Sequence, residues 1–139
     1  MSVSSIPVAN FIEPARGTRE HAAVFRAEKL KTQVIFLGEH EDERFFRAQT
    51  PNHDRHVVVI WIDDLCGEPV VNCDCPSFRL KPWPEPCVHA ATASNLATIA
   101  AKAGIELSAI QGMTIGDLGP SFYQKIRARR ELASVESDA

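Results

Sequence analysis

Hydrophobic residues recur along the chain in several patterns, and each pattern predicts a kind of element. Residues 18–31 carry apolar side chains at helical spacing, and Thr18 is a suitable N-cap, so a helix is expected there. Its apolar stripe is formed by Ala23, Val24, Ala27 and Leu30. Residues 32–37, 44–49 and 55–62 are enriched in Val, Ile, Phe or Trp, which predicts three strands.

The connections between these strands predict an antiparallel meander. Residues 38–43 form a charged link, and residues 51–54, Pro-Asn-His-Asp, have turn chemistry. Residues 70–73 then supply a fourth short strand. An alanine-rich run predicts a helix over residues 87–103, closed by Gly104.

The remaining C-terminal sequence gives a mixed picture. Residues 105–115 fit either a short second helix or a packed loop. Pro120 suits a helix start. A helix over residues 121–133 would turn an apolar set inward, formed by Phe122, Tyr123, Ile126 and Leu132.

Length and composition favour one domain. A chain of 139 residues with 45% hydrophobic content can bury a sizeable core without splitting. We expect an N-terminal arm over residues 1–17, partly ordered by docking, a single domain over 18–133, and a frayed tail over 134–139. The expected fold class is α+β: a small antiparallel sheet leads into a cysteine-rich knuckle over residues 73–89, with an N-terminal helix and a helical C-terminal half.

No targeting or membrane segment is apparent in the sequence. The longest mostly apolar stretches, residues 57–62 and 96–101, are far shorter than the roughly 20 residues of a membrane span. The N-terminus lacks the basic start and apolar run of a secretory signal. We therefore expect an intracellular protein, cytoplasmic, or nuclear if eukaryotic, with no membrane partner and no small-molecule substrate.

Three of the four cysteines and one histidine stand in two short pairs, Cys73-x-Cys75 and Cys87-x-His89. Three thiolates and one imidazole complete the tetrahedral shell of one Zn²⁺ ion and leave no open position, which indicates a structural site. Clustered cysteines in a reducing compartment favour metal binding. Two disulfides are the alternative for a secreted protein.

The stretch CDCPSF followed by CVHA resembles the SWIM zinc-finger family, whose pattern is Cys-x-Cys, a variable gap, then Cys-x-His. The resemblance covers about residues 57–103, where a strand precedes the zinc knuckle and a helix leaves it. It implies that one zinc ion is held by Cys73, Cys75, Cys87 and His89. It also implies nucleic-acid or protein binding without choosing between them.

Two positions depart from the family pattern. Val88 stands where a basic residue is frequent, and Ala90 stands where a bulkier aliphatic residue is frequent. Residues 63–87 also carry five acidic side chains against two basic ones. The knuckle is therefore expected to be a structural clasp and not a phosphate contact.

Other chemistry-bearing residues have simpler interpretations. His53 and His56 flank a turn and are expected to be exposed, with a second metal or acid-base site as the alternative. Cys66 is expected to be a small buried residue outside the ligand set. No Cys/His set other than the zinc ligands is marked for catalysis, so a non-catalytic protein is expected.

A basic cluster near the C-terminus suggests a partner. It consists of Lys125, Arg127, Arg129 and Arg130, although the chain as a whole has a net charge of −3. The first functional hypothesis is an accessory protein of DNA transactions that binds DNA or RNA through this cluster. The alternative is a protein–protein interaction adapter that docks a partner on the zinc knuckle and the loop around Trp83.

Overall fold

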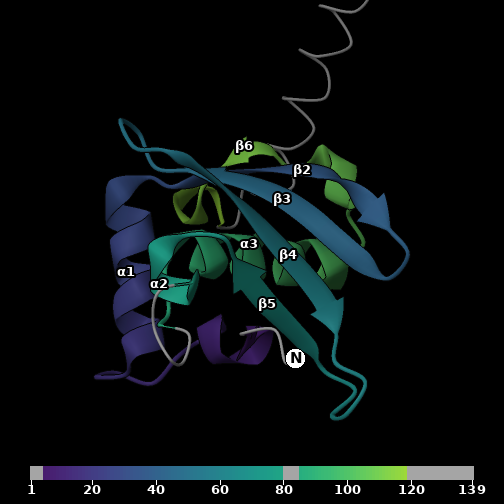
Figure 1. Cartoon of the computed structure of the whole chain (residues 1–139). Coiled ribbons are helices and arrows are strands. Elements are labelled where there is room, and N and C mark those ends of the chain that lie inside the picture. The colour runs from purple at the N-terminus through teal and green to yellow at the C-terminus, as the bar shows by residue number, and fades with distance from the viewer. Residues whose placement is uncertain (1–4, 80–84, 119–139) are drawn as a thin grey trace, which may run out of the picture.

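The computed structural model describes residues 5–79 and 85–118, which form an α+β fold (Figure 1). Six strands and three α-helices are joined by three short 3-10 helices. The strands are β1 (Ile6–Pro7), β2 (Gln33–His40), β3 (Glu43–Gln49), β4 (Arg55–Ile62), β5 (Pro69–Cys73) and β6 (Gln111–Met113). The α-helices are α1 (Arg19–Leu30), α2 (Pro76–Arg79) and α3 (Val88–Lys102), and the 3-10 helices are η1 (Val8–Phe11), η2 (Leu107–Ala109) and η3 (Ile115–Asp117).

All six strands belong to one antiparallel sheet in the order β1-β5-β4-β3-β2-β6. The meander predicted from residues 32–73 is confirmed as β2 to β5. The two outer strands were missed, since runs of two and three residues are too short to show an alternating pattern. The predicted loop over residues 38–43 is tighter than expected, because β2 continues to His40 and only Glu41 and Asp42 form the turn.

Helix α1 begins where the sequence predicted. The hydroxyl of Thr18 accepts a hydrogen bond from the backbone N–H of His21 at 3.1 Å and so caps the first turn. Ala23 and Ala27 are buried, as the apolar stripe requires. Leu30, also assigned to that stripe, is 41% exposed because the helix ends there, at the left-handed residue Lys31.

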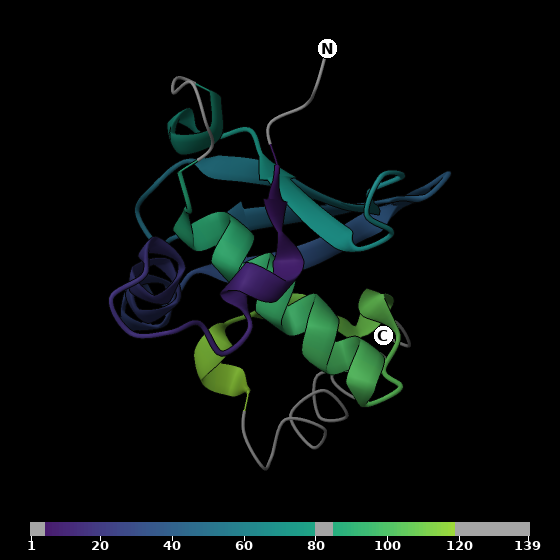
Figure 2. The same cartoon turned by 90° about the horizontal axis from the view of Figure 1, so that it is seen from below.

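Helix α3 crosses one face of the sheet, and most of the core lies between them (Figure 2). Its alanines at 90, 91, 93, 97 and 100 are all buried and let the helix approach the sheet closely. The sheet contributes the side chains of Val34, Phe46, Val58 and Val71, none of which is exposed. The chain thereby places the start of α3 beside the end of β5.

The segment predicted as an N-terminal arm docks on the domain from Ile6 onward. Ile6 pairs with Val71 of β5, and Phe11 is fully buried. The side-chain amide of Asn95 in α3 donates to the carbonyl oxygen of Phe11 at 2.9 Å. Three large apolar side chains of this segment, those of Ile6, Val8 and Phe11, therefore belong to the core.

The ambiguous residues 105–115 form neither a second α-helix nor a loop alone. Their apolar residues Ile110 and Met113 are fully buried, and β6 pairs with β2 between the helices η2 and η3. Residues 119–139, with the predicted helix and the basic cluster, lie outside the described residues. Trp83 also lies outside them.

Candidate metal centre

Four side chains converge where β5 ends and α3 begins. They are Cys73, Cys75, Cys87 and His89, and their candidate ligand atoms all lie within 4.8 Å of one another. Cys73 is the last residue of β5, Cys75 precedes α2, Cys87 is the N-cap of α3 and His89 lies in its first turn. The fold thus brings both predicted pairs together.

The first pair is fixed by backbone hydrogen bonds on both sides of the strand end. The N–H of Asp74 donates to the carbonyl oxygen of Val57 at 3.1 Å, which continues the β4–β5 ladder past Cys73. The N–H groups of Phe78 and Arg79 donate to the carbonyl oxygen of Cys75, which starts α2. Cys73 and Cys75 are 1% and 3% exposed, so their sulfur atoms are held away from solvent.

The second pair uses the start of a helix. The sulfur of Cys87 accepts a hydrogen bond from the N–H of Ala90 at 3.3 Å and so caps α3. The positive end of the helix dipole favours a thiolate at this position. Ala90, which departs from the family pattern, is fully buried against the core.

The three thiol groups shift one another's pKa values through mutual hydrogen bonds. Hydrogen bonds with Cys73 and then Cys87 hold the pKa of the Cys75 thiol well below its ordinary value. Hydrogen bonds with Cys75 and then Cys87 raise the pKa of Cys73, and burial raises it further. Without a cation, the three close sulfurs can hold only one negative charge. A divalent ion would also stabilise the thiolate forms of the other two cysteines.

The donor set fits a zinc ion. In a tetrahedral site with Zn–S bonds of about 2.3 Å, the ligand atoms stand about 3.8 Å apart, close to the observed grouping. The Nδ1 atom of His89 is buried and has no hydrogen-bond partner among the described residues. A buried polar atom without a partner costs about 1–3 kcal/mol, a cost that coordination of a metal ion by Nδ1 itself would remove.

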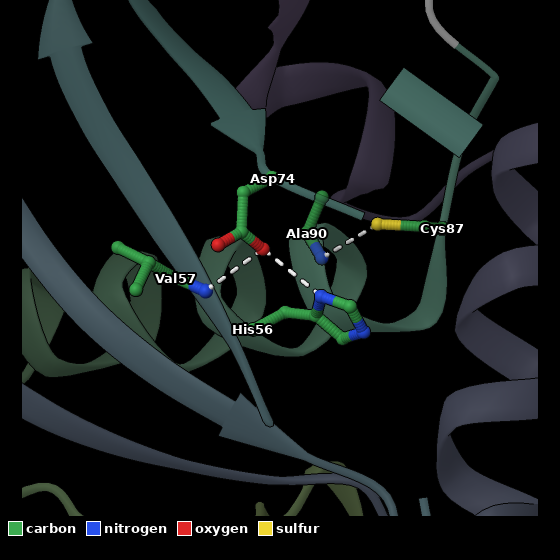
Figure 3. A network of polar contacts seen from close by, with 5 residues as sticks. All are labelled: His56, Val57, Asp74, Cys87 and Ala90. Carbon is green, nitrogen blue, oxygen red and sulfur yellow. Dashed lines mark hydrogen bonds and ion pairs between the residues drawn. The ribbon is translucent and has the colours of Figure 1, made fainter. Parts of the chain in front are cut away.

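A second histidine lies against this cluster. His56 in β4 has its Nδ1 atom 2.9 Å from Oδ1 of Asp74, and the same oxygen accepts from the N–H of Val57 at 3.1 Å (Figure 3). The ring centroids of His56 and His89 are 4.6 Å apart. Asp74 lies between the two cysteines of the first pair, so His56 links that pair to the histidine of the second.

The prediction for His56 was therefore wrong. We expected an exposed turn residue, but His56 lies in β4 on the face that carries Val58, and its side chain is only 22% exposed. The signal was present in the strand register, since extending the Val58–Cys73 pairing by two residues places His56 opposite Cys75. The Cys-x-Cys motif gives no information about the strand register, so the position of His56 could not be found from the motif alone.

A cavity of about 560 Å³ opens beside the candidate metal centre, between residues 75–89 and α1. Its lining includes Cys75, Cys87 and His89, with the exposed His53 on its rim. Arg26 and Leu30 of α1 line the opposite wall. The ligand side chains themselves remain at most 9% exposed.

The other candidates lie apart from the centre. Cys66 was expected to be buried, but it is exposed, because the acidic turn between β4 and β5 in which it lies does not pack on the core. Phe78 is 2% exposed and packs in the core. No helix among the described residues is long and apolar enough to cross a membrane.

Comparisons with protein-family models, curated proteins and solved structures found no match to this chain. The candidate metal centre is therefore supported by its own geometry.

Proposed function

We propose that this chain is a zinc-binding module of the SWIM type, in which one structural Zn²⁺ is held by Cys73, Cys75, Cys87 and His89. The convergence of these four buried side chains from two short motifs carries the proposal. A strand leads into the site and a helix leaves it, as the family pattern implies. Thiolate-rich tetrahedral sets favour zinc over Mg²⁺ or Ca²⁺.

The role of the ion in this proposal is structural and the module is non-catalytic. Three thiolates and one imidazole saturate a tetrahedral ion, so no position is left for a water or a substrate. Bound zinc would join the end of β5 to the start of α3 and contribute its binding free energy to folding. The intervening residues 76–86, which include four prolines, have little apolar content of their own.

The proposed activity is binding of DNA or RNA as an accessory protein in DNA transactions. The knuckle is a poor phosphate contact, since Asp74 lies between two ligands and Val88 stands where the family often has a basic residue. The basic cluster at 125–130 offers four cations in six residues. Phosphate binding through such a cluster is driven by counterion release and weakens with salt.

Salt-dependent binding tests this proposal directly. Zinc-loaded full-length protein is titrated with single- and double-stranded DNA and with RNA at several salt concentrations. We expect affinity to fall with salt, and to fall at least about tenfold in the variant Arg129→Ala/Arg130→Ala. The control Arg44→Ala/Arg55→Ala removes the same charge from the exposed ends of strands β3 and β4 and is expected to bind like the parent.

The alternative is a protein–protein interaction adapter that uses the zinc knuckle and the Trp83 loop. The net charge of −3 and the acidic surroundings of the site favour it over general nucleic-acid affinity. An adapter would show no salt-dependent binding to any nucleic acid. That result would replace the first proposal with the second and leave the zinc site untouched.

A further inference from the structure

The two faces of the sheet have different surroundings. Helices α3 and η1 lie on one face, and among the described residues only the one-turn helix α2, at the end of β5, lies toward the other side (Figure 2). The side chains on that second face come from the central strands. They include Ile35, Phe45, Val57, Val59 and Trp61, which we call the open face.

Strand β4 shows that the open face is unusual. Val58 and Ile60 point into the core and are at most 5% exposed, while Val57, Val59 and Trp61 alternate with them. A sheet with one face in water normally shows polar residues on that face, whereas a strand apolar on both faces is typical of a sheet covered on both sides. Val57 is 39% exposed, and the register places Phe45 beside Val59, so apolar side chains of neighbouring strands adjoin on this face. Arg47, opposite Val57, and Asn72, opposite Val59, add polar side chains to it.

The open face ends at a strongly acidic border. The β2–β3 turn and the β4–β5 turn lie at the same end of the sheet (Figure 1). The two turns and the strand ends beside them carry seven carboxylates, from Glu39, Glu41, Asp42, Glu43, Asp63, Asp64 and Glu68, while Arg44 in the same border lies 3.7 Å from Glu39. A cavity of about 400 Å³ lies at this border, lined by Glu39, Asp42 and Asp64 together with Arg44, and Trp61 of the open face reaches it.

One segment of this chain has the complementary chemistry. Residues 120–133 combine the apolar side chains of Phe122, Tyr123 and Ile126 with four cations and a single acidic residue, Glu131. The apolar residues match the open face and the cations match its acidic border. Charge complementarity of this kind fixes register and orientation in protein interfaces.

The position of the chain end indicates which copy supplies the segment. The last described residue, Leu118, follows η3, which lies on the side of the sheet that carries the helices (Figure 2). Only Gly119 separates it from Pro120, where a helix would begin, and one residue spans at most about 3.6 Å. The open face of the same molecule is on the far side of the sheet, so a second copy is the better donor.

We propose that the open face binds residues 120–133 of a second copy of this chain, and that reciprocal docking forms a homodimer. This goes beyond the proposed zinc and nucleic-acid functions and does not depend on either.

Charge exchange between two variants tests the proposal. Variant A carries Asp63→Lys and Asp64→Lys on the acidic border, and variant B carries Arg129→Glu and Arg130→Glu in the segment. Each variant alone opposes like charges, so its dimer dissociation constant should rise at least about tenfold by sedimentation or light scattering. An equimolar mixture of A and B should form the dimer again, because each partner then meets the opposite charge.

A second pair of variants tests the apolar surface. Val59→Lys on the open face should dissociate the dimer, whereas Phe25→Lys, at a phenylalanine of α1 that is 63% exposed, should not. Zinc content and the thermal melt of each variant show whether the fold is intact. A parent protein that is monomeric at all concentrations, or a mixture of A and B that stays monomeric, overturns the proposal.

Discussion

The carboxylate of Asp74 holds the imidazole of His56 at 2.9 Å, and that imidazole packs on the ring of the candidate ligand His89. Asp74 also accepts from the backbone of β4, so its side chain is fixed at both contacts. The two ligand pairs come from different elements, and this bridge connects them without taking part in the metal shell. Groups that orient metal ligands in this way tune affinity by about 10–100-fold.

His56→Ala should therefore weaken zinc binding by about tenfold or more while leaving the four ligands in place. Competition with a chromophoric chelator measures the affinity, and the Co²⁺-substituted protein reports the ligand geometry through its absorption bands. His56→Gln, which retains a polar partner for Asp74, should give an intermediate value. The control His53→Ala alters an exposed histidine of the β3–β4 turn and should match the parent; equal losses in both variants would contradict the bridge.

Removal of one ligand should loosen the region that the ion joins. Cys75→Ser, or treatment with a chelator, is expected to abolish stoichiometric zinc binding and to increase amide exchange over residues 70–103, since metal binding and folding are coupled. Elemental analysis and hydrogen exchange measure the two effects. Cys66→Ser changes the exposed cysteine outside the cluster and should retain one zinc per chain; a parent chain that contains no zinc after expression would refute the site.

Zinc affinity should fall as the pH falls. The pKa of Cys73 is raised, chiefly by its hydrogen bond to Cys75, so its thiol is protonated at neutral pH. For Cys87, the hydrogen bond with Cys73 lowers the pKa, but that with Cys75 and burial raise it, to about 12. Zinc must then displace about two protons, and each unit of pH should change the apparent affinity by up to about a hundredfold. Chelator competition at several pH values checks this, and an affinity independent of pH would contradict thiolate coordination.

The residue pattern predicted the central part of the fold well, because those elements have strong local signals. Thr18 has the hydroxyl that caps α1, and the Val- and Phe-rich runs became strands with boundaries shifted by a few residues at most. The short strands β1 and β6 depend on pairing with residues far away in the chain. Their positions could not be read from two or three residues of local sequence.

The candidate site likewise combines residues with a local sequence signal and residues that only long-range pairing brings together. Its four ligands were visible from their spacing, because Cys-x-Cys and Cys-x-His are local patterns. His56 and Asp74 meet only through the β4–β5 register, and the apolar outward side chains of β4 became meaningful only when the other face of the sheet was seen to be occupied by α3. The predicted role of the basic cluster at 125–130 stays a prediction.

The buried position of Phe11 predicts that the first residues of the chain are part of the folding unit. Its ring is fully buried in the core between the sheet and α3, and truncation of such an aromatic side chain to alanine costs about 3–5 kcal/mol. Phe11→Ala should lower the stability of the zinc-loaded protein by that amount in chemical denaturation. Phe25→Ala is the matched control, since Phe25 lies on α1 with 63% of its surface exposed and should change stability by no more than about 0.5 kcal/mol. Equal effects of the two substitutions would mean that residues 6–11 are an appended arm and not part of the core, because only an undocked Phe11 would be as dispensable as Phe25.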